Sequence, residues 1–136
     1  MKTWHSIFLL TALLLMVFTQ AAGAQATPPQ AVPKYDPATE ATLKGTIIAI
    51  SERNCPVSGT LGFHFVLKLE DGKTLEVHVA ASQMMKTYEI TLNKGDQVEV
   101  TGSKVKFGGE DTILARQVVR GNDIYVFRDK NGKPAW

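Results

Sequence analysis

The stretch LGFHFVLKLEDGKTLEVHVA, residues 61–80, alternates apolar and polar residues on both sides of a short Glu-Asp-Gly segment. Alternation of this kind is typical of strands that bury one face. A three-residue loop at residues 70–72, with Gly72 in the left-handed conformation, predicts a type I turn followed by a bulge. The stretch therefore predicts a β-hairpin.

The loop length fixes the register of this hairpin, and the register sorts its residues onto two faces. One face holds apolar pairs that should point into a core: Leu67 with Leu75, Phe65 with Val77, and Phe63 with Val79. The other face holds the remaining pairs: Lys68 with Thr74, Val66 with Glu76, and His64 with His78. Opposed residues have Cβ atoms about 4.5–5.5 Å apart, which is close enough for two imidazoles to share one metal ion.

Further short runs on both sides of the hairpin predict an all-β domain. Alternating or β-branched segments are found at residues 41–52, 98–107 and 112–120, and a C-terminal strand, turn and return follow. Residues 81–92 are the one stretch that suits a short helix, with Ser82 as its N-cap. Five strands with a helix between the third and fourth predict a small OB-fold-like Greek-key barrel with a C-terminal β extension.

The N-terminus has the layout of a secretory signal peptide. Lys2 precedes an apolar run at residues 7–18, and the small residues Ala22, Gly23 and Ala24 follow. Cleavage is expected between Ala24 and Gln25, because the run is shorter than the ~20 residues that a spanning helix needs. An uncleaved membrane anchor is the alternative. Cleavage predicts a periplasmic or secreted protein without a membrane span.

The expected domain organisation follows from this division. Residues 1–24 form the signal peptide, residues 25–40 a proline-rich flexible leader, and residues 41–136 the OB-fold-like domain. The leader has four prolines and few large apolar groups, so an extended conformation is expected.

Several quoted segments carry a family resemblance that covers roughly residues 40–120. The signal sequence, ATLKGTIIAI, a hairpin centred on EDGK, KGDQVEVTGSKV and a closing ARQVV resemble the small exported bacterial OB-fold proteins of the periplasmic BOF family. The resemblance implies a non-enzymatic envelope protein, often linked to stress or assembly, with no catalytic residues to carry over.

Charge and aromatic placement argue against a nucleic-acid partner. The chain has 15 Lys and Arg against 13 Asp and Glu, and Lys2 belongs to the signal peptide. A near-neutral surface lacks the electrostatic footprint of nucleic-acid binding. Phe63 and Phe65, which could stack on bases, are assigned to the core face. Nucleic-acid or oligosaccharide binding by the OB-fold is kept as an alternative function.

The outer face of the hairpin is the candidate ligand-binding face, because OB-folds bind ligands over their second and third strands. Its residues are His64, Val66, Lys68, Glu76 and His78. One interpretation is that the histidines are half-exposed polar residues on the exterior of the sheet, and no cofactor is then needed.

The alternative interpretation is a metal site on the same face. A stable zinc site needs three or four protein ligands, whereas this face offers two histidines. Met84 and Met85 follow the third strand, and thioethers combined with imidazoles would suit copper. Those methionines can equally fill the core beside the short helix.

Cys55 is the only cysteine, which excludes an internal disulfide. It is a free thiol, an intermolecular partner or a buried small residue, and burial is favoured because free cysteine is among the most buried residue types. We place it in a loop at residues 53–60, where no activating partner is predicted, so an enzyme is not expected.

The tail contributes three aromatic residues. Tyr125 and Phe127 share one strand face and should close the bottom of the barrel, whereas Trp136 is a candidate exposed interface residue. The sequence as a whole predicts an exported, non-catalytic binding or interaction module of the bacterial cell envelope, whose partner is an envelope protein or a small ligand. The first alternative is a periplasmic copper- or zinc-binding protein that uses His64 and His78.

Overall fold

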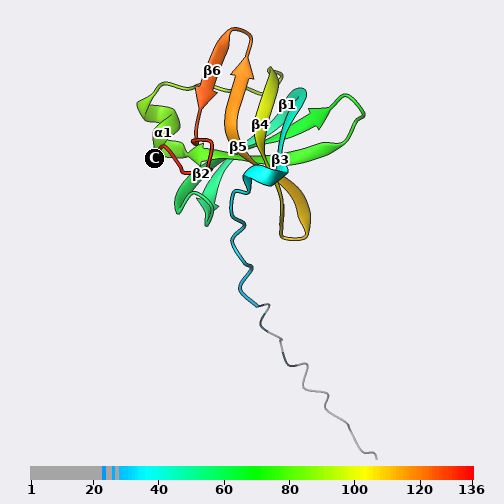
Figure 1. Ribbon diagram of the computed structural model, residues 1–136, viewed down its shortest axis with the longest axis vertical. Coiled ribbons are helices and arrows are strands. Elements are labelled where there is room, and N and C mark those ends of the chain that lie inside the picture. The colour runs from blue at the N-terminus through cyan, green and yellow to red at the C-terminus, as the bar shows by residue number, and fades with distance from the viewer. Residues whose placement is uncertain (1–22, 24–25, 27) are drawn as a thin grey trace, which may run out of the picture.

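A computed structural model describes residues 23, 26 and 28–136 of the chain. The predicted signal peptide and its cleavage site lie outside the described residues, apart from Gly23. The described part contains six strands, one short α-helix and one 3-10 turn (Figure 1). Their bounds are η1 Pro37–Thr39, β1 Glu40–Cys55, β2 Thr60–Leu69, β3 Thr74–Ala81, α1 Ser82–Thr87, β4 Gln97–Phe107, β5 Glu110–Arg120 and β6 Asp123–Val126.

The strands form one sheet that closes on itself. Their order is β3-β2-β1-β4-β5-β6, and β3 also pairs in parallel with β5, which joins the first five strands into a ring. With α1 between β3 and β4, this is the OB-fold-like barrel that the sequence predicts, and β6 is the C-terminal β extension. The fold prediction is confirmed.

Strand β1 is long because it serves two neighbours. Its first half pairs with β4, and the stretch from Gly45 to Cys55 pairs with β2. A Cβ atom on Gly45 would lie 2.3 Å from the carbonyl oxygen of Lys68, so only glycine allows this approach of the two backbones. A β-bulge between Ile47 and Ala49 then bends the strand around the barrel.

The core lies inside the ring and is built from the apolar face of the hairpin. Phe65, Leu67 and Val77 are at most 1% exposed and pack with apolar residues of the other strands. Complete burial of one such side chain contributes about 1.5–3 kcal/mol. Met84 and Met85 of α1 are buried in the same core cluster.

The predicted hairpin register holds from the turn to the histidines and then shifts. Gly72 has φ +85°, as the turn requires, and His64 pairs with His78. Beyond this pair Phe63 faces Ala80 instead of Val79, so the predicted Phe63–Val79 pair is wrong. A bulge at this point inserts one residue into β3, and the added twist helps to close the barrel.

Two element ends differ from the prediction. Ala81, not Ser82, is the N-cap of α1, and the buried hydroxyl of Ser82 has no hydrogen-bond partner among the described residues. Strand β1 continues to Cys55, three residues past the predicted end, because its pairing with β2 extends to Thr60. Cys55 therefore lies at the end of a strand and not in a loop.

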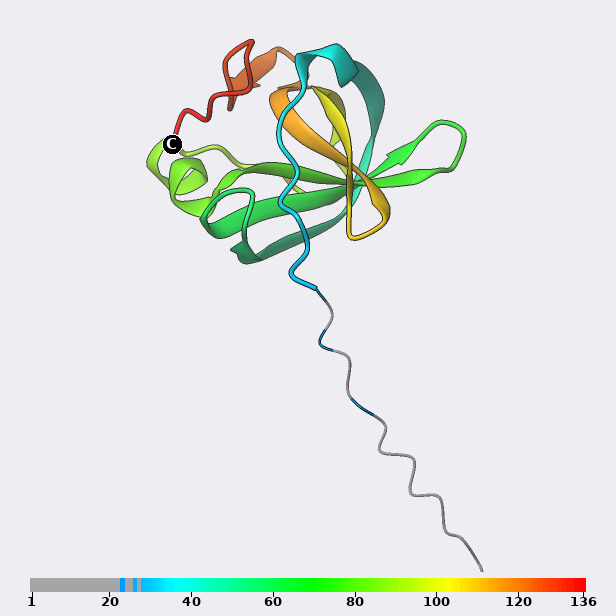
Figure 2. The ribbon, with the colours of Figure 1, turned by 60° about the horizontal axis from the view of Figure 1, so that its bottom comes forward.

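The end of the leader is fastened to the barrel. Figure 2 shows residues 28–36 running across one side of the domain before η1. Arg116 donates from Nε and Nη2 to the two carboxylate oxygens of Glu40 at 2.9 and 2.8 Å, and the Tyr35 hydroxyl donates to the same carboxylate. We call these three side chains the clamp. Asp36 adds a backbone hydrogen bond to Ser103 Oγ at 3.0 Å.

The C-terminal segment, residues 127–136, returns to the barrel. Phe127 is fully buried, and a turn at residues 129–132 leads into an antiparallel bridge between Arg128 and Pro134. The C-terminus ends beside α1 in both views (Figures 1 and 2). Within the described residues, no helix has the length and apolar character needed to cross a membrane.

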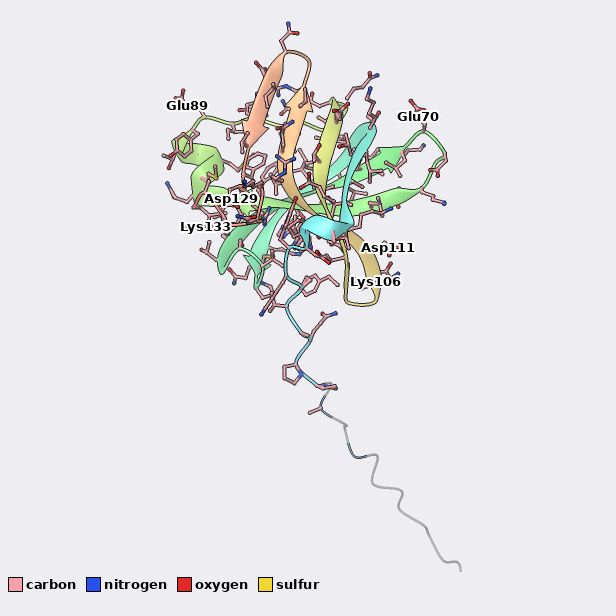
Figure 3. All side chains as sticks on the ribbon, in the orientation of Figure 1. Glu70, Glu89, Lys106, Asp111, Asp129 and Lys133 are labelled. Atoms are coloured by element: carbon pink, nitrogen blue, oxygen red, sulfur yellow. The ribbon has the colours of Figure 1, made fainter. Side chains whose placement is uncertain are left out.

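Two hairpins project from the barrel and carry charged tips (Figure 3). Glu70 lies at the tip of the β2–β3 hairpin, and Lys106 pairs with Asp111 at 2.6 Å on the β4–β5 hairpin. The two histidines lie at the opposite end of the β2–β3 hairpin from Glu70.

Candidate metal centre

Three strands bring Cys55, His64 and His78 together. Cys55 ends β1, His64 lies in β2, and His78 lies opposite it in β3. One ligand atom from each residue lies within 4.8 Å of those of the other two. The side chains are 5%, 1% and 2% exposed respectively, so the cluster is buried.

This burial corrects the expectation that the histidines are half-exposed on the outside of the sheet. The register does place them on the face opposite the core, as predicted. The face is covered at this end because β1 runs on to Cys55 and residues 56–59 fold over it, and because Arg128 returns from the C-terminus. The ring of Phe107 also packs edge-on against His78, with centroids 5.4 Å apart.

The geometry within the cluster favours a shared ligand. Cys55 Sγ lies 3.2 Å from His78 Nδ1, and the two imidazole rings are perpendicular with centroids 4.4 Å apart. His64 Nδ1 and His78 Nε2 are buried without a hydrogen-bond partner among the described residues. Orphaned buried nitrogens are rare in folded proteins and call for an explanation.

Burial also sets the protonation of both rings. Desolvation lowers the pKa of His64 and of His78, and for His78 the neighbouring imidazole lowers it further. Both rings are therefore neutral at pH 7. A neutral imidazole keeps a lone pair, which is the form that binds a metal ion.

Glu76 stands behind His78 at the edge of the cluster. Its carboxylate oxygen Oε2 lies 3.8 Å from His78 Nε2, and the same side chain pairs with Arg53. A carboxylate that accepts a hydrogen bond from a metal-bound histidine orients the ring and fixes which nitrogen carries the proton, and Glu76 lies just beyond that distance. A proton on Nε2 would leave His78 Nδ1, which faces Cys55, as the ligand atom.

Arg128 places a positive charge in the wall of the same pocket. It is 3% exposed and donates from Nη1 to the carbonyl oxygens of Val79, at 3.0 Å, and Ala115. Burial lowers the pKa of Arg128 to about 10, so the guanidinium stays charged at pH 7. No carboxylate pairs with it in the part of the chain that the structure describes.

Gly62 provides the space for the cluster. A Cβ atom at this position would lie 2.9 Å from both Cys55 Cβ and His64 Cε1. Any larger residue would push the side chains of Cys55 and His64 apart.

The other predicted site residues lie outside this cluster. On the hairpin face, Val66 is partly buried and Lys68 is exposed. Met84 and Met85 lie in the core cluster inside the barrel and are not among the residues that meet at Cys55, His64 and His78.

Trp136 is not the exposed residue that the sequence predicts. Its indole Nε1 donates to the carbonyl oxygen of Ser58 at 3.2 Å, and Arg128 lies over its ring at 4.8 Å. Trp136 is partly buried and packs on the core. The returning segment turns it inward, so it helps to cover the cluster.

Sequence reasoning missed Cys55 and Arg128 as members of the site. Their contacts to the hairpin depend on the true end of β1 and on the path of the tail. The only available signal was a single free thiol in a chain that also carries two opposed histidines.

Comparison with known proteins identifies the family. The model of the MamS/MamX magnetosome protein family matches residues 39–125. The chain belongs to the MamS/MamX magnetosome protein family. The match includes Cys55, His64 and His78 and ends before Arg128 and Trp136. The BOF resemblance is thus a likeness in fold, and membership in the BOF family is not shown.

Two further comparisons concern individual proteins. No curated protein matches this MamS/MamX protein. Among solved structures, the N-terminal domain of PriB protein from Thermoanaerobacter tencongensis, a dimeric structure, is 16% identical. That match covers 63% of this chain and 99% of the other, with a TM-score of 0.48.

Proposed function

We propose that this protein is an exported, non-catalytic binding module of the bacterial envelope, and that it binds one transition metal ion through Cys55, His64 and His78. The convergence of these three donors in one buried pocket supports the proposal, with ligand atoms within 4.8 Å of one another. The family name associates the module with magnetosomes.

The donor set restricts the kind of metal. A thiolate and two imidazoles are ligands of zinc, copper and related transition metals, whereas calcium and magnesium take oxygen ligands. The orphaned Nδ1 of His64 would gain a partner when a metal binds. The cost of burying this nitrogen without a hydrogen bond is then offset in the loaded protein.

Burial supports binding over catalysis. A catalytic metal keeps an open position for water or substrate. The walls of this pocket, all from described residues, leave no space for a water-sized sphere. A closed site suits a protein that stores, carries or is stabilised by its metal.

Metal analysis of the purified protein tests this function. After dialysis against a mixture of copper and zinc and removal of excess metal, we expect one transition metal ion per chain. Cys55→Ser, His64→Gln and His78→Gln should each lose the ion. Lys68→Ala, an exposed change on the same hairpin, should retain it. Circular dichroism checks that each variant is folded, and equal loading of the variants and the wild type would refute the assignment.

Export is a separate part of the proposal and needs its own test. The chain expressed in a bacterial host should be recovered from the periplasm with Gln25 as its first residue. Recovery in the membrane fraction with an intact N-terminus would favour the uncleaved anchor instead.

A further inference from the structure

The space in the metal centre limits the coordination number. A zinc ion with three protein ligands completes its tetrahedron with water or a fourth side chain. The pocket formed by the described residues has no room for a water molecule. Glu76 is the nearest carboxylate to His78, but it is one-third exposed and held outside by Arg53. The centre therefore offers three ligands and no fourth.

The charge of the surroundings limits the charge of the ion. One thiolate, two neutral imidazoles and a monovalent ion are together neutral. A divalent ion would leave a net positive charge in a buried pocket beside the guanidinium of Arg128, which has no carboxylate partner among the described residues. Uncompensated charge is costly to bury, and two like charges in one pocket are costlier.

The softness of the donors points the same way. Soft thiolate ligands select Cu(I), zinc and iron–sulfur clusters, and imidazole suits copper and zinc, so Cu(I) is the monovalent ion that this donor set favours. Cu(I) is satisfied by three such ligands in a plane, whereas zinc takes four. Sites of two histidines and one cysteine that hold Cu(II) use a weak axial ligand in addition.

On the basis of the metal centre proposed above, we infer that the bound ion is Cu(I), held by Cys55, His64 and His78 without water. On binding, the Cys55 S–H bond breaks and a Cu–S bond forms. The thiol proton leaves to solvent, both imidazoles contribute lone pairs, and copper does not change oxidation state. One proton is therefore released for each ion bound.

Anaerobic titration of the purified protein with Cu(I), followed by X-ray absorption spectroscopy, tests this inference. We expect one Cu(I) per chain, one proton released, and three ligands comprising one sulfur and two nitrogens. A parallel titration with Zn(II) should give no stoichiometric complex that survives a competing chelator.

The outcomes separate the inference from the proposed function. One zinc or Cu(II) ion per chain, held by the same three residues with an added oxygen ligand, would overturn the assignment to Cu(I) and leave a metal-binding module. Failure of copper and zinc alike to bind would overturn both.

Arg128 provides a second test that isolates charge. In Arg128→Met the affinity for Zn(II) relative to Cu(I) should rise by about tenfold or more, the scale of changes next to metal ligands. Arg128→Lys keeps the charge and should keep the wild-type ratio. The same ratio in all three proteins would remove the charge argument, and the ligand count of the wild-type site then decides the question.

Discussion

The molecule contains two clusters of polar side chains that are built in opposite ways. In the clamp, both carboxylate oxygens of Glu40 accept hydrogen bonds from Arg116, and the Tyr35 hydroxyl donates to the same carboxylate. In the metal centre, one nitrogen of each histidine has no partner among the described residues. The clamp is only partly buried, whereas the metal centre is closed to solvent.

The difference separates a structural cluster from a binding one. A polar cluster that only stabilises a fold is expected to satisfy its own hydrogen bonds, because each unpaired buried group is costly. A cluster that leaves buried nitrogens without hydrogen bonds lowers the stability of the protein until a ligand or ion pairs with them. The clamp therefore stabilises the fold without any ligand, whereas the centre, as we propose, needs a bound ion to complete its contacts.

The largest expected loss of stability follows from substituting a residue that supports both clusters. Phe127 is fully buried, its backbone N–H bonds to the carbonyl of Arg116 at 2.8 Å, and Arg128 follows it into the wall of the metal centre. Phe127→Ala should lower the free energy of unfolding by about 3–5 kcal/mol, as for other buried phenylalanines. Urea unfolding measures this value.

The neighbouring residue supplies the control for this change. Val126 is 52% exposed, so Val126→Ala should cost less than about 0.5 kcal/mol. If the two variants were equally stable, the C-terminal segment would not be packed on the barrel as described.

The next largest loss of stability is expected for a substitution that breaks the clamp and leaves the metal centre intact. Arg116→Met removes both hydrogen bonds to the Glu40 carboxylate and should cost about 1.5–3 kcal/mol, the range for hydrogen bonds to charged groups. The matched control is Lys106→Met, which breaks the exposed pair with Asp111 and should leave the free energy of unfolding almost unchanged, because water and salt screen such pairs. Metal binding should survive in both variants. Loss of metal in Arg116→Met would show that the clusters are not independent.

The fold was largely predictable because its signals are local. The three-residue turn at Gly72 fixes the hairpin register, and the register alone places His64 opposite His78. The order of strands and helix then indicates the OB-fold. The parallel pairing of β3 with β5, which closes the ring, has no sequence signal of its own, and it follows only from the fold class.

The metal centre was predictable only in part. Alternation tells which face of a strand a residue occupies, and it does not tell what covers that face. The cover over His64 and His78 comes from Cys55 and from Arg128, 50 residues beyond His78 in the chain. Cys55 reaches the histidines because β1 pairs with β2 along its whole second half, and Arg128 reaches them because the C-terminal segment turns inward. Tertiary packing decides both.

The clamp should also give the protein a specific sensitivity to acid. Hydrogen bonds from Arg116, and then from Tyr35, lower the pKa of Glu40 from 4.5 to about 2. The unfolded chain then binds a proton at a higher pH than the folded one, so the stabilisation is complete above pH 4.5 and is lost as the pH falls toward 2. Melting temperatures measured across this window should fall less steeply in Glu40→Gln than in the wild type. Parallel curves for the two proteins would assign the acid sensitivity to other groups.

The smallest expected change is a gain in the free energy of unfolding, not a loss. It tests the contrast between the clamp and the metal centre most directly. His64 is 1% exposed and its Nδ1 has no partner among the described residues, so in the metal-free protein this nitrogen is buried at a cost that no hydrogen bond offsets. His64→Leu places an apolar side chain of similar size in the same pocket, and it should leave the stability of the apoprotein unchanged or raise it by up to about 1 kcal/mol. The variant should lose the metal, and with it the added stability that copper gives the wild type. Urea unfolding with and without Cu(I) measures both quantities on one protein. If His64→Leu destabilised the apoprotein as much as Arg116→Met does, His64 would be a paired structural residue like those of the clamp, and the contrast between the two clusters would disappear.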